Sequence, residues 1–146
     1  MANCHWVAND NMTGRKVFSL PVRVYFQDTD AGGVVYHSNY LNFMERARTE
    51  WLRAHGYSNA GLMKEFGMVF VVRSIKLDYL KPALLDDRLD VTARIKDIGR
   101  SRISLVQNIL RGAEVLTEAE VHLVCVSLQS FKPVSVPEVL RVQLEK

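Results

Sequence analysis

One stretch of this sequence repeats with the period of a helix, and every later stretch of similar length repeats with the period of a strand. The helical stretch begins after Ser38, a residue type that caps helix N-termini, and ends before Gly56, which suits a helix C-terminus. Its apolar residues recur three or four positions apart: Tyr40, Phe43, Met44, Ala47, Trp51 and Ala54. We therefore expect one helix of about 17 residues, roughly 25 Å long.

Strand periodicity accounts for most of the remaining chain. Apolar and polar residues alternate in five runs: 22–27, 69–80, 89–95, 103–110 and 115–129. The segment 59–66 suits a short helix, and turns at 97–100 and 111–113 join the last three runs as hairpins. The sequence thus predicts an α+β fold in which a curved antiparallel sheet packs against one helix. Such a sheet has an exposed edge, which a second copy of the chain covers most simply, so we expect a homodimer.

Length and composition place the chain among single-domain globular proteins. It has 146 residues, of which 48% are hydrophobic and 24% charged, and its net charge is only +3. We divide it into an N-terminal extension, residues 1–18, and one domain, residues 19–146. The basic residues are scattered, so nucleic acid is not an expected partner. No apolar run approaches the ~20 residues that span a bilayer, so no transmembrane segment is expected.

The cysteines do not have the spacing of a metal site. Cys4 and Cys125 lie far apart, and Cys125 falls in an apolar run that suits a buried thiol. This usage is typical of the reducing cytoplasm, where we expect the protein to reside. Neither a metal nor a cofactor is expected.

Candidate chemistry concentrates between the first strand and the helix. Asp28 and Asp30 follow the strand, Gly32 and Gly33 come next, and His37 precedes the helix. Glycines let a ligand approach the backbone, and a helix N-terminus offers N–H groups to a developing oxyanion. Ordinary turn formation also explains this motif, and a metal site made from both aspartates and His37 would lack further ligands.

The polar residues of the predicted helix have a simpler interpretation. Glu45 and Glu50 lie off the apolar stripe. We expect both on a solvated face, together with Arg46, Arg48 and Arg53.

A longer string carries a resemblance to a known family. Residues 23–40, RVYFQDTDAGGVVYHSNY, resemble the signature of the 4-hydroxybenzoyl-CoA thioesterase family. The continuation Glu45–Glu50 and the ending His55-Gly56-Tyr57 are similar to a branch of bacterial acyl-CoA thioesterases associated with the Tol-Pal envelope system. The resemblance extends from Leu20 to about Val139.

This resemblance implies a hotdog fold, in which the sheet wraps the long helix, and hydrolysis of an acyl-CoA thioester. It implies dimers or tetramers with active sites at the subunit interface. Asp30 maps to the catalytic carboxylate, and the backbone N–H of His37 maps to the oxyanion donor, with a side chain that can assist. Gly32, Gly33, Val34 and Tyr36 then belong to the substrate site. The nucleotide end of CoA maps loosely to Arg100 and Ser101. A solvated basic turn that binds no ligand would have the same sequence.

Several alternatives stay open at this stage. Asp30 can act as a general base or as a nucleophile that forms a mixed anhydride. A hotdog dehydratase would use His37 with Glu50, and a non-catalytic module would bind acyl-CoA or acyl carrier protein in the same pocket. The carrier of the acyl group, CoA or acyl carrier protein, and the acyl group itself are not readable from one sequence.

Overall fold

The computed structural model describes residues 4–9 and 14–146. In chain order the elements are β1 (His5–Asn9), β2 (Lys16–Arg23), the 3-10 helix η1 (Phe26–Asp28), α1 (Asn39–Ala54), α2 (Asn59–Phe66), β3 (Met68–Tyr79), β4 (Arg88–Ile98), β5 (Arg102–Arg111), β6 (Glu114–Ser127) and α3 (Glu138–Leu144). Within this part of the chain, no helix is both long enough and apolar enough to cross a membrane.

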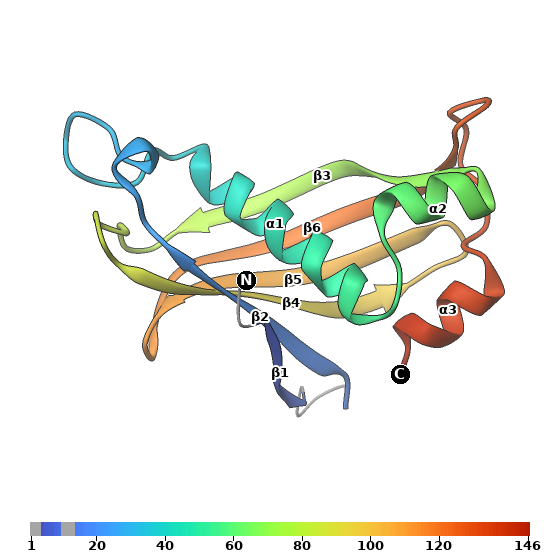
Figure 1. The fold of residues 1–146 in the computed structure, drawn as a ribbon, viewed down its shortest axis with the longest axis horizontal. Coiled ribbons are helices and arrows are strands. Elements are labelled where there is room, and N and C mark those ends of the chain that lie inside the picture. The colour runs from blue at the N-terminus through green and yellow to red at the C-terminus, as the bar shows by residue number, and fades with distance from the viewer. Residues whose placement is uncertain (1–3, 10–13) are drawn as a thin grey trace.

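All of these strands belong to one antiparallel sheet, in the order β1-β2-β4-β5-β6-β3. Helix α1 lies across one face of the curved sheet (Figure 1). The four strands after α1 match the predicted runs to within two residues at most ends. The alternation of buried and more exposed residues is clearest in β4, whereas β3 is mostly exposed. The predicted hotdog arrangement is confirmed.

Helix α1 buries the face that its apolar spacing indicates. Tyr40, Phe43, Met44, Ala47 and Trp51 are each at most 3% exposed. The predicted end of this stripe is wrong, because Ala54 is exposed and Leu52 is buried instead. Helix α2 lies beside the C-terminal part of α1, and its Met63 lines the same cavity as Leu52. Ser38 occupies the N-cap position, but its side chain makes no capping hydrogen bond.

The predicted strand at 22–27 is displaced. Strand β2 ends at Arg23, and residues 26–28 form the 3-10 turn η1. Val24 is fully buried, whereas Tyr25 and Phe26 are 61% and 81% exposed. The alternation of residue types therefore continues past the point where the chain leaves the sheet. Pro21 lies inside β2, beyond the residues that pair with β1, where the lack of an N–H removes no bond to that strand.

Part of the N-terminal extension joins the sheet. Strand β1 pairs with β2 at the sheet edge. The Trp6 ring contacts Phe18 and His55 edge-on, with centroid distances of 5.4 and 5.1 Å. The division of the chain at residue 18 stays a prediction, and residues 1–3 and 10–13 of the extension lie outside the described residues.

Arg48 departs from its predicted place on the solvated face of α1. It is half-buried, and its Nη1 donates a hydrogen bond to Oε1 of Gln107 in β5 over 2.9 Å. Arg48 follows Met44 by one helical turn, so both residues project from the side of α1 that faces the sheet. Glu50, in contrast, forms a surface ion pair with Arg53 over 2.7 Å.

Candidate active site

Asp28 is a structural brace between η1 and α1. Its side chain is only 7% exposed. Oδ2 accepts a hydrogen bond from the backbone N–H of Tyr25 at 2.8 Å, and Oδ1 accepts one from Asn39 Nδ2 at 2.7 Å. The carbonyl of Asp28 also accepts from Tyr36 N at 2.9 Å. Both carboxylate oxygens are therefore occupied by groups that hold the loop in shape.

Asp30, two residues later, has an exposed side chain. Its Oδ1 accepts a hydrogen bond from Gly32 N at 2.8 Å, and its backbone pairs with Val34 and Gly33 in a tight loop. Gly33 has a φ of +79°, a left-handed conformation that favours glycine. A Cβ on Gly32 would lie 3.2 Å from Asp30 Oδ1, so a larger residue would crowd the carboxylate. Oδ1 is thus oriented by the loop, and Oδ2 accepts no hydrogen bond within the described residues.

The chain enters α1 with unpaired backbone donors. The N–H groups of His37 and Ser38 make no hydrogen bond to any other described residue. The carbonyl of His37 accepts a hydrogen bond from Tyr79 Oη over 2.6 Å, which joins this residue to the end of β3. The His37 ring is exposed and lies 4.4 Å from the Tyr36 ring, centroid to centroid. These N–H groups, at the positive end of a helix dipole, suit an oxyanion.

A shallow hollow of about 260 Å³ opens beside these donors. His37, Tyr40 and Tyr79 line it together with Val35 and the segment that follows β3. Tyr40 and Tyr79 meet edge-to-face with ring centroids 5.3 Å apart. Partial burial, with Tyr40 nearby, raises the pKa of Tyr79 above its ordinary value, so its hydroxyl remains a donor at neutral pH.

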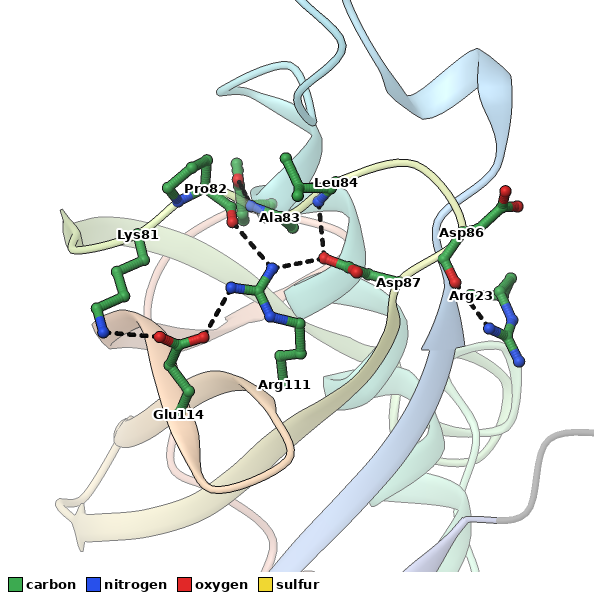
Figure 2. Close-up of polar contacts among 10 residues, drawn as sticks. Arg23, Lys81, Pro82, Ala83, Leu84, Asp86, Asp87, Arg111 and Glu114 are labelled. Carbon is green, nitrogen blue, oxygen red and sulfur yellow. Dashed lines mark hydrogen bonds and ion pairs between the residues drawn. The ribbon is translucent and has the colours of Figure 1, made fainter.

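The segment 81–87 packs against residues 28–36, the candidate loop, and against α1. Val35 N donates to Ala83 O at 2.9 Å, and Ala83 N donates to Tyr40 Oη at 3.0 Å. Figure 2 shows that Arg111 anchors this segment, because its guanidinium bonds Asp87 at 2.6 Å, Glu114 at 2.7 Å and the carbonyl of Pro82 at 3.2 Å. Strand β5 therefore helps to position the loop, through a residue that sequence reasoning missed.

Four of the predicted substrate-site residues lie in this loop. Gly32 and Gly33 form its tip, the carbonyl of Val34 accepts from Asp30 N at 2.9 Å, and Tyr36 exposes 49% of its surface. Their proposed contacts with substrate stay predictions.

Arg100 and Ser101 lie at the opposite end of the sheet, in the turn between β4 and β5 near α3 (Figure 1). Strand β4 separates the two ends by about 33 Å, from its length and the usual rise per residue. Arg100 Nε donates to Ser135 Oγ at 2.8 Å, and the Ser101 carbonyl accepts from Cys125 N at 2.7 Å. One chain alone therefore does not bring these residues to Asp30.

Neither the residue pair of a dehydratase nor a metal-binding cluster is formed among the described residues. Glu50 lies near the C-terminal end of α1, about 20 Å along the helix from position 37, so the pairing that a dehydratase would use is not formed within this chain. In residues 4–9 and 14–146, no group of three or more His, Cys, Asp or Glu side chains is arranged to hold a metal ion.

Sequence reasoning also missed Tyr79 and its contact with His37. Tyr79 is simply the last residue of an alternating strand, and a hydrogen bond across 42 positions leaves no local signal. Arg111 is equally inconspicuous, because it resembles any basic residue at a hairpin turn.

Comparisons with known proteins point to one family. A profile of the thioesterase-like superfamily matches residues 24–144. The chain is similar to the acyl-CoA thioesterase YbgC of Haemophilus influenzae, with 45% identity over 121 residues that cover 83% of this chain and 89% of the relative. It is 46% identical over 123 residues to the acyl-CoA thioester hydrolase YbgC of Escherichia coli O157:H7, covering 84% and 91% of the two chains.

Solved structures agree as well. A probable thioesterase from Bartonella henselae matches with a TM-score of 0.78 and 36% identity, covering 82% of this chain and 98% of that chain. The 1,4-dihydroxy-2-naphthoyl-CoA thioesterase from Synechocystis matches with a TM-score of 0.81 and 26% identity, covering 88% and 95%.

Proposed function

The chain belongs to the thioesterase-like superfamily, and on this premise we propose that it hydrolyses acyl-CoA thioesters, with Asp30 as the catalytic carboxylate. The products are a free acid and the CoA thiol. Relatives of at least 45% identity carry the names acyl-CoA thioesterase and acyl-CoA thioester hydrolase, which supports this activity.

The observation that carries the assignment of Asp30 is the contrast between two carboxylates in one loop. Asp28 is buried, and both of its oxygens accept hydrogen bonds from the protein. Asp30 is exposed and is held by a single N–H, from Gly32. Only Asp30 has an oxygen available to a water molecule or to a thioester carbon.

The thioester carbonyl oxygen would bind the free N–H of His37, where negative charge develops during attack. In the general-base route, Asp30 takes a proton from water, the water oxygen bonds to the carbonyl carbon, and the C–S bond breaks as the thiolate leaves. In the covalent route, an Asp30 oxygen attacks the carbon, the thiolate leaves, and water then cleaves the mixed anhydride. The exposed imidazole of His37 can assist from beside the same N–H.

A thiol-release screen tests the function. We expect release from acyl-CoA substrates of graded length, from aroyl-CoA, or from acyl carrier protein thioesters, and the pattern would identify acyl group and carrier. Ligand-dependent stabilisation without thiol release from any member of the panel would instead support a binding module. Single-turnover hydrolysis in oxygen-18 water separates the two routes, because label in the Asp30 carboxylate supports the covalent one.

We also propose that the chain forms a homodimer or homotetramer through β3. This strand pairs with β6 on one side only and ends the sheet. Val71 and Val72 in it are 38% and 46% exposed, an apolar edge that a second copy would cover. Light scattering on the wild type and on Val71→Lys tests this, since a charge at the β3 edge should weaken the assembly. Val142→Lys makes the same substitution on α3 and serves as the control. A monomeric wild type would contradict it.

A cytoplasmic location is part of the same proposal. Cys125 is buried in β6, where burial raises the pKa of its thiol to about 11. An inert thiol of this kind is compatible with a reducing compartment. Cell fractionation with an antibody to the protein tests the location.

A further inference from the structure

A second cavity, of about 370 Å³, lies between α1, α2 and β3. It shares no lining residue with the hollow beside His37. Its walls are mainly apolar and include Leu52 from α1, Met63 from α2, Phe70 from β3 and Leu123 from β6. Two charged side chains, Glu45 and Arg48, border this apolar space from α1.

Arg48 is held in place by a buried amide. Its Nη1 donates to Oε1 of Gln107, which is 0% exposed. The Gln107 amide is itself locked, because Nε2 donates to the carbonyls of Met44 at 3.0 Å and Thr92 at 3.2 Å. These two bonds orient the Gln107 oxygen toward Arg48 and hold the guanidinium against β5.

The guanidinium has no anionic partner within the described chain. Gln107 is the only acceptor that bonds it there, and Glu45 acts on it without forming an ion pair. Burial lowers the pKa of Arg48 from its ordinary value, but a guanidinium remains charged at neutral pH. A guanidinium carries five N–H donors, and among the described residues only the hydrogen bond to Gln107 uses one of them. A desolvated cation in this state gains most from a carboxylate, which can accept two parallel hydrogen bonds.

We infer that this cavity selects acyl groups that end in a carboxylate, and that Arg48 binds that carboxylate while the methylene chain packs against the apolar walls. The inference rests on the proposed thioesterase function, and it narrows the substrate class to dicarboxylic acid monothioesters. Arg48 is a specificity residue here, and Gln107 is a positioning residue that acts through it.

The cavity lies farther along α1 than the expected position of the thioester. Arg48 lies about 16 Å along the helix axis from position 37, where the thioester is expected. The charged end of the acyl group would therefore bind far from the reacting carbon. Changes at Arg48 should alter selectivity without altering the chemistry at Asp30.

The first test compares pairs of acyl-CoA substrates of equal chain length, one ending in a carboxylate and one in a methyl group. We expect the wild type to favour the carboxylate member in kcat/KM by roughly tenfold to a hundredfold at the best length. Arg48→Met keeps most of the aliphatic stem and should remove this preference by raising KM for the carboxylate-ended substrates, with a much smaller change for the methyl-ended ones. Glu45→Gln removes a competing anion and should increase the preference.

Arg53→Met is the matched control, since it removes a positive charge from the surface of the same helix and should leave the preference intact. Equal activity of the wild type on both members at every length would overturn the inference. So would equal losses on both members in Arg48→Met, which would mean that Arg48 only anchors α1 to β5.

Free acids separate this inference from the proposed function. We expect dicarboxylates of graded length to stabilise the wild-type protein against heat more than monocarboxylates of the same length do. This measurement needs neither CoA nor turnover. It tests the preference for a second carboxylate on the wild-type protein, even if Arg48→Met fails to fold. Equal shifts with both acid types at every length would overturn the inference, whereas a failed thiol-release screen would overturn only the thioesterase assignment.

Discussion

The hydroxyl of Tyr79 donates a hydrogen bond to the backbone carbonyl of His37 over 2.6 Å. This bond ties the last residue of β3 to the residue whose N–H faces the candidate oxyanion position. Because a peptide unit is planar, fixing this carbonyl also helps to fix the backbone at the entrance to α1. The edge strand β3 is therefore linked to the start of α1 by a direct hydrogen bond.

Tyr79→Phe should lower kcat several-fold and leave KM nearly unchanged. The phenyl ring keeps its edge-to-face contact with Tyr40, and the lost hydrogen bond is worth about 0.5 to 1.5 kcal/mol. Steady-state kinetics measure kcat and KM, and chemical denaturation measures the change in the free energy of unfolding. Tyr25→Phe, at an exposed position of the same residue type, serves as the control. Unchanged kcat in Tyr79→Phe would contradict a positioning role.

Asp30→Asn should abolish turnover and leave the free energy of unfolding nearly unchanged, because the amide is neither a base nor a competent nucleophile. Asp28→Asn should show the opposite pattern. One of its two oxygens becomes an NH₂ group that faces a donor, at a cost of about 1 to 3 kcal/mol, while much of the activity survives. Turnover assays and denaturation curves of both variants decide this. Equal losses of activity would remove Asp30 as the catalyst.

His37→Ala should reduce activity only in part, because alanine retains the backbone N–H. Loss of one oxyanion donor typically costs about 2.7 to 4 kcal/mol, or roughly a hundredfold to a thousandfold in rate. His37→Pro deletes the N–H, which makes no bond within the described protein, and proline is tolerated at helix entries. The proline variant should therefore be the slower of the two. If it folds and matches the alanine variant in kcat, the backbone oxyanion role is wrong.

His55 should make the folded state less stable in mild acid. Burial, reinforced by the charge of Lys16 and opposed by a hydrogen bond to the Gln143 backbone, lowers the pKa of His55 below 6.5. The unfolded chain then binds the proton more readily than the folded chain, so stability present above about pH 6.5 is lost as pH falls through the folded pKa.

Denaturation of the wild type and His55→Phe at about pH 7, 6 and 5 checks this expectation. Phenylalanine keeps a ring against Trp6 and Trp51 but cannot titrate. The free energy of unfolding should fall less steeply with acid in the variant. Parallel slopes would show that His55 does not contribute to the pH dependence.

Local periodicity was enough to predict most of the fold. The apolar stripe of α1 and the alternation of β3 to β6 are readable because residues a few positions apart must face the same core. The same logic failed at 22–27, where the alternation of residue types continues although β2 ends at Arg23 and residues 26–28 form η1.

Residues 28–36 show the same difference between what local sequence predicts and what contacts in the fold decide. Its aspartates, glycines and histidine, and the resemblance of residues 23–40, identify the place and the family from the sequence. The two aspartates differ in their partners, because Asn39 and Tyr25 donate to the carboxylate of Asp28 and not to that of Asp30. Asp-Thr-Asp by itself does not distinguish them.

Arg48 shows most clearly the difference between local periodicity and long-range contacts. The sequence by itself determined that it lies on a helix, one turn after a core methionine, and its charge favoured a place on the surface. Only the tertiary structure decided that it meets Gln107, 59 positions later, beneath α1. The physical reason is that periodicity reports the direction of a side chain from its own element, whereas burial and hydrogen bonding depend on which distant strand lies opposite, and sheet pairing sets that.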